Sequence, residues 1–369
     1  MIRVVRHQIV ACERSLDAPI GNPGRELSQR RSLVVLLYDE AGRCGHGEAS
    51  PLPGYSPERL EEVEGALRAR LSAPLILAGD RPEAMLNAIR EACYGLGLET
   101  PSASFALESA LLDLAARVLE LPAAALLRPN SAAGDDPKGP STQLQNGALL
   151  SAATAAGVEE AAHRAVEAGY VAFKLKLGPD DRLEQDLERL RAVRRAIGSS
   201  KQLRLDANRS FSLTAAQRLI DQVGPLCPEY LEEPTHSPNL DRLDAAGVPL
   251  ALDESLQGSA TIRQALTCLG SPAIRVAVLK PAALGLLHAV DLAVEARELG
   301  MDVVVTHLFD GPVAMAAAAE LAFAWATPER AQGLAPHPFM HASRWRVTGL
   351  EGATMARALG PGLPLEELA

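Results

Sequence analysis

Along residues 143–310, short apolar stretches alternate with longer stretches in which apolar residues recur every three or four positions. The short stretches, such as YVAFKLKLG, QLRLDAN and RVAVLKPAALG, have the length and composition of buried strands. The longer ones, such as DRLEQDLERLRAVRRAIG, have the periodicity of helices with one buried face. Strands and helices that alternate in this way predict an α/β fold built on a parallel sheet.

A polar residue stands at the end of each predicted strand, and the spacing of these residues measures the repeat. They are Asn146, Lys176, Asp206, Glu232, Asp253, Lys280 and Thr306, at intervals of 30, 30, 26, 21, 27 and 26 residues. A strand with its crossover helix and loops needs about 30 residues. With an eighth strand expected at 332–336, the pattern predicts a (β/α)₇β barrel of the TIM type. A doubly wound sheet is the alternative, but the stretch NGALLSAATAAG lacks that fold's glycine-rich phosphate turn.

In the first third of the chain, the pattern of apolar and polar residues differs and predicts strands followed by helices. The segment RSLVVLLYDE at 31–40 predicts a strand, and the segments at 56–75 and 104–121 have helical periodicity. We expect Ser102 or Ser104 to be the N-cap of the second helix. Residues 128–142 are rich in proline, glycine and serine and predict a linker between two domains.

Composition and charge limit the class of protein. The 369 residues are 47% hydrophobic and 22% charged, as in soluble globular proteins. The formal net charge of -10 argues against a nucleic-acid partner, although a local cationic pocket could still bind a small anionic substrate. The N-terminus lacks the apolar core of a signal peptide, and the longest alanine-rich run is interrupted by Glu320. We therefore expect a cytoplasmic protein with no membrane partner.

Acidic side chains mark the ends of three consecutive predicted strands. In LRLDAN, Arg204, Asp206 and Asn208 alternate with apolar residues and so share one face of the strand. Asp206, Glu232 and Asp253 end the third to fifth strands, and catalytic groups of barrels lie at such ends. Three neighbouring carboxylates repel each other unless a cation joins them, and hard oxygen ligands suit Mg²⁺. The pattern predicts an Mg²⁺ site, with Mn²⁺ as a substitute.

Two lysines stand on either side of these acids. Lys176 ends the second strand and Lys280 ends the sixth, about half a turn apart in an eight-stranded barrel. A cation that chelates a substrate carboxylate makes the neighbouring C–H more acidic. A lysine can remove that proton when its pKa falls, and the nearby cation Lys174 would lower it. We therefore predict proton abstraction next to a carboxylate of a small anionic substrate.

Other interpretations of these residues remain open at this point. A single acid at a strand end is commonly a helix cap, so only the ordered set with two lysines favours a catalytic role. Glu233 is expected to face outward or to support its neighbour, and the lone histidines His236 and His307 are more often structural. A glycosidase pair of Glu232 and Glu233 is disfavoured because adjacent strand residues point to opposite faces. A non-catalytic barrel would be expected to lack a ligand or a lysine, and none is missing.

The motifs occur in the order found in the muconate-lactonizing subgroup of the enolase superfamily, which the chain resembles. These motifs are KLK, DAN, EEP, DES and KP, beginning at Lys174, Asp206, Glu232, Asp253 and Lys280. Within the subgroup, LRLDANRSF and GHGEASPLPGYSPERLEE (45–62) resemble the o-succinylbenzoate synthase family. The resemblance implies an α+β capping domain at 1–127, a barrel at 143–336 and a segment at 337–369 that returns to the capping domain.

The resemblance also implies roles for single residues. Asp206, Glu232 and Asp253 would bind Mg²⁺, Lys176 would remove the α-proton and then help to expel a hydroxyl, and Lys280 would stabilise the enediolate. Lys174, Arg204 and Asn208 would either orient the substrate or support the groups that contact it, and the Gly311 N–H would donate to an anion where the family often has serines. The reaction would be dehydration of 2-succinyl-6-hydroxy-2,4-cyclohexadiene-1-carboxylate in menaquinone biosynthesis. An N-succinylamino acid racemase or a dipeptide epimerase would use the same metal and lysines.

Overall fold

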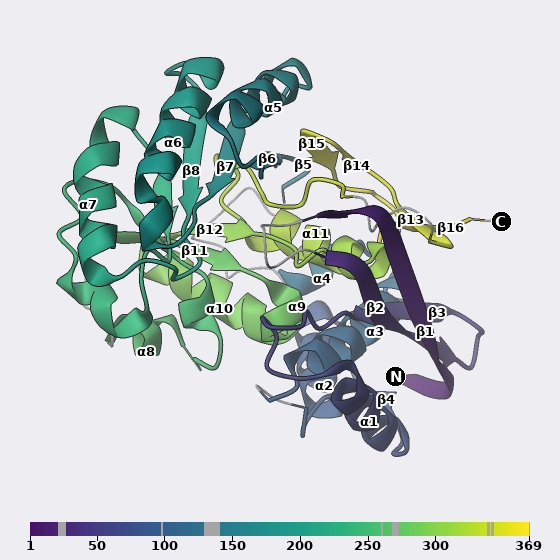
Figure 1. The fold of residues 1–369 in the computed structure, drawn as a ribbon. Coiled ribbons are helices and arrows are strands. Elements are labelled where there is room, and N and C mark those ends of the chain that lie inside the picture. Colours follow the sequence, from purple (N-terminus) through teal and green to yellow (C-terminus); the bar gives the residue numbers. More distant parts are fainter. Residues whose placement is uncertain are drawn as a thin grey trace.

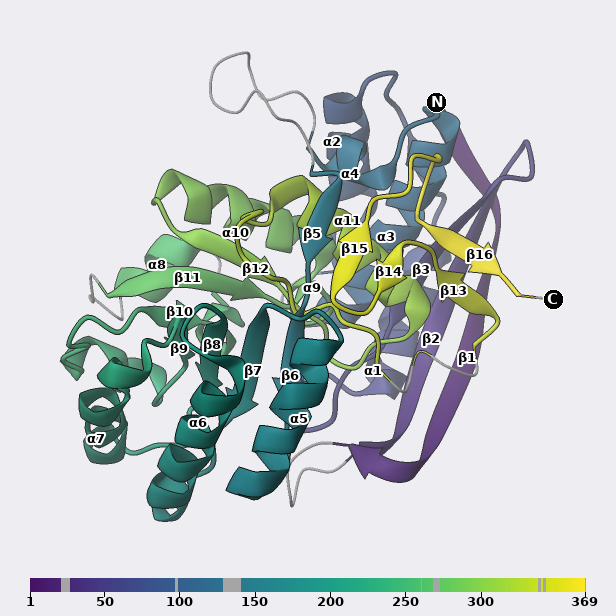
Figure 2. The same ribbon diagram turned by 90° about the horizontal axis from the view of Figure 1, so that it is seen from above.

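The chain forms an N-terminal region of strands and helices that lies against a larger parallel sheet and its helices (Figure 1, Figure 2). The computed structural model describes residues 1–20, 27–96, 99–128, 141–259, 261–267, 273–337, 340 and 343–368. Within these ranges no helix has both the length and the apolar composition needed to cross a membrane.

The N-terminal region contains an antiparallel sheet of four strands in the order β3-β2-β1-β4. The strands are β1 (Ile2–Ile20), β2 (Leu27–Asp39), β3 (Cys44–Ala49) and β4 (Ile76–Leu77). The predicted strand at 31–40 is part of β2, and it is apolar on both faces. One face of β2, with Leu33 and Val35, packs on the main core, while Val34 and Leu36 pack against Val313 and against residues of the C-terminal strands.

Four helices belong to this region: α1 (Leu60–Leu71), α2 (Pro82–Ala92), α3 (Pro101–Val118) and α4 (Ala123–Leu127). Helix α3 lies directly on β3, because Gly47 has no side chain and a Cβ there would meet the Ala106 carbonyl oxygen at 1.8 Å. The prediction that Ser102 or Ser104 is the N-cap of this helix is wrong. Thr100 is the N-cap, and Ser102 and Ser104 are buried inside the helix. The reason is Pro101, whose fixed φ and missing N–H suit the first helical position.

The second part of the chain is a parallel sheet of seven strands that neighbour each other in sequence order, which confirms the predicted alternation. The strands are β6 (Gly147–Leu150), β7 (Ala172–Lys176), β8 (Gln202–Asp206), β9 (Tyr230–Glu232), β10 (Leu250–Leu252), β11 (Ile274–Leu279) and β12 (Asp302–Val305). The helices are α5 (Ala155–Glu167), α6 (Leu183–Ile197), α7 (Leu213–Val223), α8 (Ile262–Thr267), α9 (Pro281–Leu284), α10 (Leu286–Glu298) and α11 (Pro312–Trp325). Figure 2 shows α5, α6 and α7 on the outer side of the sheet.

Residues 332–333, in the stretch expected to form the eighth strand, connect the first and last strands of this sheet. Gln332 forms a parallel bridge with Asn146, and Gly333 forms one with Thr306. The Gly147 N–H donates to the Gln332 carbonyl oxygen at 2.7 Å, and the Gly333 N–H donates to that of Val305 at 2.8 Å. The two outer strands of the sheet therefore bond to adjacent residues of one short segment, β6 to Gln332 and β12 to Gly333.

The predicted first strand, QLQNGALL, divides between two sheets. Residues Gln143–Gln145 form β5, which pairs with β15 (Thr354–Ala356) in a small antiparallel sheet with β14 (Leu350–Glu351). Asn146 separates β5 from β6, and its backbone N–H and side-chain amide donate to the carbonyl oxygens of Ala353 and Gly352. The expected linker at 128–142 lies largely outside the described residues, which omit 129–140.

The C-terminal strands return to the N-terminal region. Strand β13 (Trp345–Val347) pairs with β16 (Leu365–Glu367), and both figures show them beside β1 and β2. The side chain of Trp345 is buried against Val34 and Leu36 of β2. Residues far apart in the sequence therefore share one apolar cluster at this interface.

Buried carboxylates of the N-terminal region cap helices of the second part. The Glu48 carboxylate accepts hydrogen bonds from the N–H groups of Val313 and Ala314, at 3.1 and 3.3 Å, where α11 begins. The Glu108 carboxylate accepts one from the N–H of Leu287 at 3.0 Å, where α10 begins. The first N–H groups of a helix have no partner within it, and they favour a negative charge. These contacts therefore fix the N-terminal region on two helix starts.

Candidate active site

Three acidic side chains lie together at the carboxyl edge of the parallel sheet. Asp206 and Glu232 are the last residues of β8 and β9 and are paired in register, and Asp253 follows β10 directly. All three are at most 2% exposed. They lie above a layer of apolar side chains on the same face, formed by Tyr230, Ala251, Val276, Val278 and Val304. The alternation of the sequence thus places these acids and this apolar layer on the same face of the sheet.

Two ammonium groups contact these carboxylates. The Lys174 Nζ atom lies 2.7 and 2.8 Å from the oxygens of Glu232 and 2.9 Å from Asp206 Oδ2. Lys280 forms an ion pair with Asp253. Burial alone would raise the pKa of Asp206, but the nearby ammonium groups, Lys174 foremost, lower it to about 2. The negative charge of the cluster is thus balanced by lysines that come from strands on both sides of it.

The carboxylates also act on each other. Burial raises the pKa of Glu232 well above its ordinary value, and the neighbouring charges of Asp206 and Asp253 raise it further. Among the described residues, no three acidic, histidine or cysteine side chains stand at metal-ligand spacing. The meeting of all three acids at one point therefore stays a prediction. The donor set, three buried carboxylates on adjacent strand ends, nevertheless has the chemistry that Mg²⁺ prefers.

Lys176 lies on the side of the cluster opposite to Lys280. It ends β7, whereas Lys280 follows β11, and β8, β9 and β10 lie between these strands. Its Nζ atom donates to Asn208 Oδ1 at 3.4 Å and lies 4.0 Å from Asp206 Oδ2. Lys174, Lys176 and Asn208 are therefore all brought to the carboxylates, as the sequence predicts.

Tyr55, from the N-terminal region, is a member of the site that sequence reasoning did not single out. Its hydroxyl donates to Asp253 Oδ1 at 2.9 Å, and the Lys280 Nζ atom lies 4.5 Å from the centre of its ring. A cation at this distance from an aromatic face is attracted to it. Tyr55 lies in the segment 45–62, which resembles a loop of the family. No local pattern in that segment distinguishes Tyr55 from its neighbours, so the sequence did not predict its contact with Asp253.

Glu233 supports the segment that carries Asp253. Its carboxylate accepts hydrogen bonds from the backbone N–H groups of Asp253 and Ser255, at 2.9 and 2.7 Å, and pairs with Arg209 at 3.1 Å. Its φ of +40° lies in the left-handed region, so the chain turns sharply after β9. The expectation that Glu233 supports its neighbour agrees with this geometry, because its carboxylate is bonded to the segment after β10 and to Arg209.

Arg204 shares the inner face but lies deeper than the acids. Its guanidinium pairs with Glu229 at 2.5 Å and donates to the Ala331 carbonyl oxygen at 2.7 Å. It also lies 5.0 Å from the centre of the Tyr230 ring, and Glu229 pairs in turn with Arg330. The structure therefore places Arg204 in a polar network near the amino ends of the strands and not among the carboxylates.

The start of α11, where Gly311 was expected to bind an anion, holds a carboxylate of the protein itself. A Cβ on Gly311 would lie 2.0 Å from Glu48 Oε1, so this glycine and the Glu48 carboxylate are in close contact. Glu48 is also bonded to Ser32 and Arg14, at 2.6 and 3.1 Å. The structure thus brings Gly311 to an anion from β3, which competes with any substrate anion for this position.

The two histidines near strand ends are placed differently. His236 is exposed and precedes a short 3₁₀ helix, Ser237–Arg242. His307 lies edge-on to the Phe309 ring and tilted against the His337 ring, and its Nδ1 accepts from the Phe309 N–H at 2.9 Å. Burial lowers the pKa of His307 well below its ordinary value. These contacts agree with the structural role expected of His307, and the role of His236 stays a prediction.

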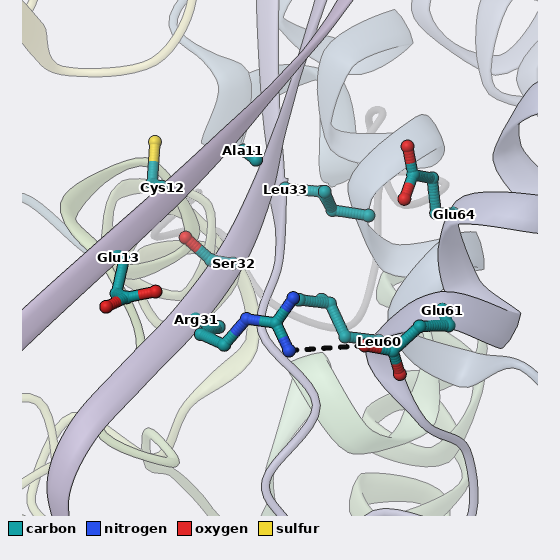
Figure 3. A pocket seen from close by; sticks show the side chains of 9 residues that line it. All are labelled: Ala11, Cys12, Glu13, Arg31, Ser32, Leu33, Leu60, Glu61 and Glu64. Atoms are coloured by element: carbon teal, nitrogen blue, oxygen red, sulfur yellow. Dashed lines mark hydrogen bonds and ion pairs between the residues drawn. The ribbon is translucent and has the colours of Figure 1, made fainter.

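A surface pocket lies elsewhere, between β1, β2 and α1 (Figure 3). Cys12, Glu13, Arg31, Glu61 and Glu64 are among its lining residues, and Arg31 pairs with Glu61 at 3.2 Å. Acids predominate among its charged groups, and none of the lysines and acids at the sheet edge lines it. The pocket is therefore separate from the candidate active site.

Comparison with known proteins assigns relatives to both parts of the chain. The family model of the mandelate racemase / muconate lactonizing enzyme N-terminal domain matches residues 6–127, and the enolase C-terminal domain-like model matches residues 157–365. The o-succinylbenzoate synthase of Enterobacter sp. (strain 638) is 30% identical over 334 residues, 89% of this chain and 89% of that protein.

Two further relatives have other activities. The N-succinyl-L-Arg/Lys racemase of Bacillus cereus is 25% identical over 304 residues, 80% of this chain and 77% of that protein. A solved structure of a dipeptide epimerase from Methylococcus capsulatus, complexed with Mg and the dipeptide L-Arg-D-Lys, is 25% identical. It covers 98% of this chain and 99% of that one with a TM-score of 0.81. Since a family model spans more than half of the chain, the protein belongs to the enolase superfamily of Mg²⁺-binding enzymes.

Proposed function

We propose that the protein is an o-succinylbenzoate synthase, which dehydrates 2-succinyl-6-hydroxy-2,4-cyclohexadiene-1-carboxylate to 2-succinylbenzoate in menaquinone biosynthesis. The observation that carries the chemistry is the position of Lys176 and Lys280 on two sides of three buried carboxylates. The choice of the synthase is supported by 30% identity with the Enterobacter synthase over 89% of both chains, against 25% for the racemase and the epimerase. A small anionic carboxylate substrate suits a site rich in lysine.

Asp206, Glu232 and Asp253 would hold the Mg²⁺, with Mn²⁺ as a substitute. Their carboxylates are buried and are already bound to cationic groups, so a divalent cation would compete with the ammonium groups of Lys174 and Lys280. When bound, the ion would polarise the substrate carboxylate and make the neighbouring C–H more acidic. Once the cation had displaced them from the carboxylates, the ammonium groups of Lys174 and Lys280 would be available to the substrate.

Lys176 would act first as a base and then as an acid. As the neutral amine, it would take the α-proton, and the C–H electron pair would move into the substrate carboxylate to give the enediolate. When the enediolate collapses, this electron pair would form the new ring double bond and the C–O bond to the hydroxyl would break. The hydroxyl would take the proton from Lys176 and depart as water. Lys280 would stabilise the negative charge from the opposite side, and Lys174 and Asn208 would orient the substrate.

The alternative is a racemase of N-succinyl amino acids or a dipeptide epimerase. Each lysine would then exchange a proton with one face of the α-carbon, so the same two groups would serve a different reaction. The relatives with racemase and epimerase activity support this alternative. A hydroxyl leaves in the synthase reaction but not in racemisation or epimerisation. An assay of the product therefore distinguishes the two functions.

The test is turnover of the cyclohexadiene substrate by the purified protein with Mg²⁺, followed through the ultraviolet absorbance of the aromatic product. We expect Lys176→Ala to abolish turnover while Mg²⁺ binding, measured by calorimetry, is retained. If the substrate is not converted but N-succinyl amino acids exchange their α-proton in D₂O, the alternative replaces the synthase. Turnover by Lys176→Ala at the rate of the unchanged protein would remove Lys176 as the base.

We also propose the domain organisation that accompanies this function. A capping domain at 1–127, a linker at 128–142, a (β/α)₇β barrel at 143–336 and a segment at 337–369 returning to the cap agree with two observations. Residues 332–333 bond to both outer strands of the sheet, and Trp345 packs on β2. The cytoplasmic location stays a prediction.

A further inference from the structure

Asn208 connects Lys176 to a carboxylate that is not among the three acids. Its Oδ1 accepts from Lys176 Nζ at 3.4 Å, and its Nδ2 donates to Glu254 Oε1 at 3.2 Å. An ammonium group can only donate hydrogen bonds, so the amide oxygen must face Lys176. The NH₂ group then faces Glu254, which accepts. The orientation of this amide is therefore fixed by a cation on one side and a carboxylate on the other.

The backbone brings these three residues together from separate strands. After β8 the chain turns at Asn208, whose φ of +44° is left-handed, and the Asn208 N–H donates to Asp206 Oδ1 at 3.2 Å. This turn, two residues beyond the strand, aims the side chain across the sheet edge. Glu254 follows Asp253 at the start of a short 3₁₀ helix, Glu254–Leu256, on the far side of β9. The amide thus spans from the end of β7 to the end of β10.

Glu254 has few other partners. Its second carboxylate oxygen, Oε2, is buried and has no hydrogen-bond partner among the residues that the structure describes. Asn208 is thus the side chain to which the other oxygen is bonded. A half-buried acid with one buried, unbonded oxygen contributes little to the fold through hydrogen bonds, because such an oxygen is costly. Its position is better explained by what it does to Asn208.

We propose that Glu254 is a positioning residue, which acts through Asn208 to hold the Lys176 ammonium on the side of the carboxylates opposite to Lys280. The two lysines are then held by different contacts. Lys280 pairs with Asp253 and lies against the ring of Tyr55, whereas Lys176 bonds to the amide that Glu254 orients. The charge of Glu254 also acts on Lys280. Loss of Glu254 therefore removes a charge near Lys280, but it removes the partner that orients the amide only on the side of Lys176. The inference rests on the proposed function only for the role of Lys176 as the base.

The first experiment does not need activity. The lysines are labelled by reductive ¹³C-methylation, and the signals of Lys176 and Lys280 are assigned with Lys176→Arg and Lys280→Arg. We expect Glu254→Ala to shift the Lys176 signal because the amide loses its partner, and to shift the Lys280 signal because a nearby charge is lost. Glu254→Gln also removes the charge, so it should leave the Lys280 shift in place. Glu254→Gln, which keeps an acceptor oxygen for Asn208, restores the Lys176 signal. Glu184→Ala serves as the control, because Glu184 is exposed and pairs with Arg218 on the surface.

The second experiment measures dehydration of the cyclohexadiene substrate. Misplacement of a catalytic group by about 1 Å can cost on the order of 100-fold in rate. We expect Glu254→Ala to lower kcat by about 10- to 100-fold with KM changed less than about threefold, and Asn208→Ala to add little to it. Mg²⁺ affinity by calorimetry should be the same in Glu254→Ala as in Glu254→Gln, since the two variants remove the same charge and Glu254 is bonded to Asn208 rather than to one of the three proposed ligands.

The outcomes separate this inference from the proposed function. If Glu254→Gln shifted the Lys176 signal as much as Glu254→Ala does, Glu254 would act through its charge on the carboxylate cluster and not through Asn208, and the inference would be wrong. An unchanged Lys176 signal in a folded Glu254→Ala protein would also overturn it. If the Lys176 signal shifts but the unchanged protein does not dehydrate the substrate, the positioning role stands and the synthase proposal fails.

Discussion

Replacement of Glu48 by alanine tests the contact between the N-terminal region and α11. The Glu48 carboxylate is fully buried and bonds to Arg14, to the Ser32 hydroxyl and to two N–H groups at the start of α11. The Arg14 side chain is 4% exposed. Glu48→Ala would therefore leave a buried guanidinium without its carboxylate and the first turn of α11 without its cap.

The size of the effect follows from these two losses. Removing one partner of a buried ion pair costs about 3–5 kcal/mol, and loss of a helix cap costs about 1 kcal/mol. The two share one carboxylate and are not summed, so we expect about 4 kcal/mol. For a chain of 369 residues, an unfolding entropy of about 2.1 cal/mol/K per residue converts this to a fall in Tm of about 5 °C.

The assay is thermal unfolding followed by circular dichroism, together with chemical denaturation at 25 °C. Glu48→Gln, which keeps an acceptor oxygen, should lose less stability than Glu48→Ala. Glu64→Ala is the matched control, because Glu64 also pairs with an arginine, Arg68, but on the surface of α1. Such exposed pairs contribute about 0.3–0.5 kcal/mol. If Glu48→Ala were no less stable than Glu64→Ala, the capping of α11 from β3 would not be a stabilising contact.

Three further predictions follow from the same contacts. Gly311→Ala would place a Cβ 2.0 Å from Glu48 Oε1, so it should lower Tm in the unchanged protein and lower it less in the Glu48→Ala background; equal losses would contradict the close contact. Tyr55→Phe removes the hydrogen bond to Asp253 and should weaken Mg²⁺ binding by about tenfold or more in calorimetry, and unchanged affinity would contradict it. Burial opposes protonation of His46, but hydrogen bonds from its ring to Asp113 and Cys44 raise its pKa to about 9. A raised histidine pKa stabilises the fold fully below about pH 6.5, and this is lost as the pH rises through 9. The stability difference between the unchanged protein and His46→Gln should therefore shrink between pH 6 and pH 10, and a constant difference would refute the assignment.

The parallel sheet and the acids on its edge could be predicted because both depend on local patterns. Alternation places Asp206 and Asn208 on one face, and a repeat near 30 residues brings successive strand ends to the same edge. The division of QLQNGALL could not be predicted in this way. Asn146 is bonded to residues 352 and 353, more than 200 positions away, and no pattern within the strand indicates that contact.

The rest of the site was hidden for two physical reasons. Alternation shows which face a residue occupies but not its depth, and Arg204, two residues before Asp206, lies about 7 Å deeper along the strand. Contacts from the N-terminal region are also invisible to a local pattern. Tyr55 is 198 positions from Asp253, and Glu48 is 265 positions from Val313. Gly311 was expected to bind an anion of the substrate. The sequence around Gly311 does not indicate that the Glu48 carboxylate, from a distant strand, lies against it.

The network around Arg204 bears on how this scaffold could change its substrate. Arg204, Glu229, Arg330 and Asp302 join β8, β9 and β12 to the segment before residue 332, at the end of the sheet away from the lysines. Strand register is thus secured by ion pairs that lie away from the carboxylate cluster. Substitutions around the lysines would leave these ion pairs intact. Residues near the carboxylates could therefore change during selection for a new reaction while the register of the strands is kept.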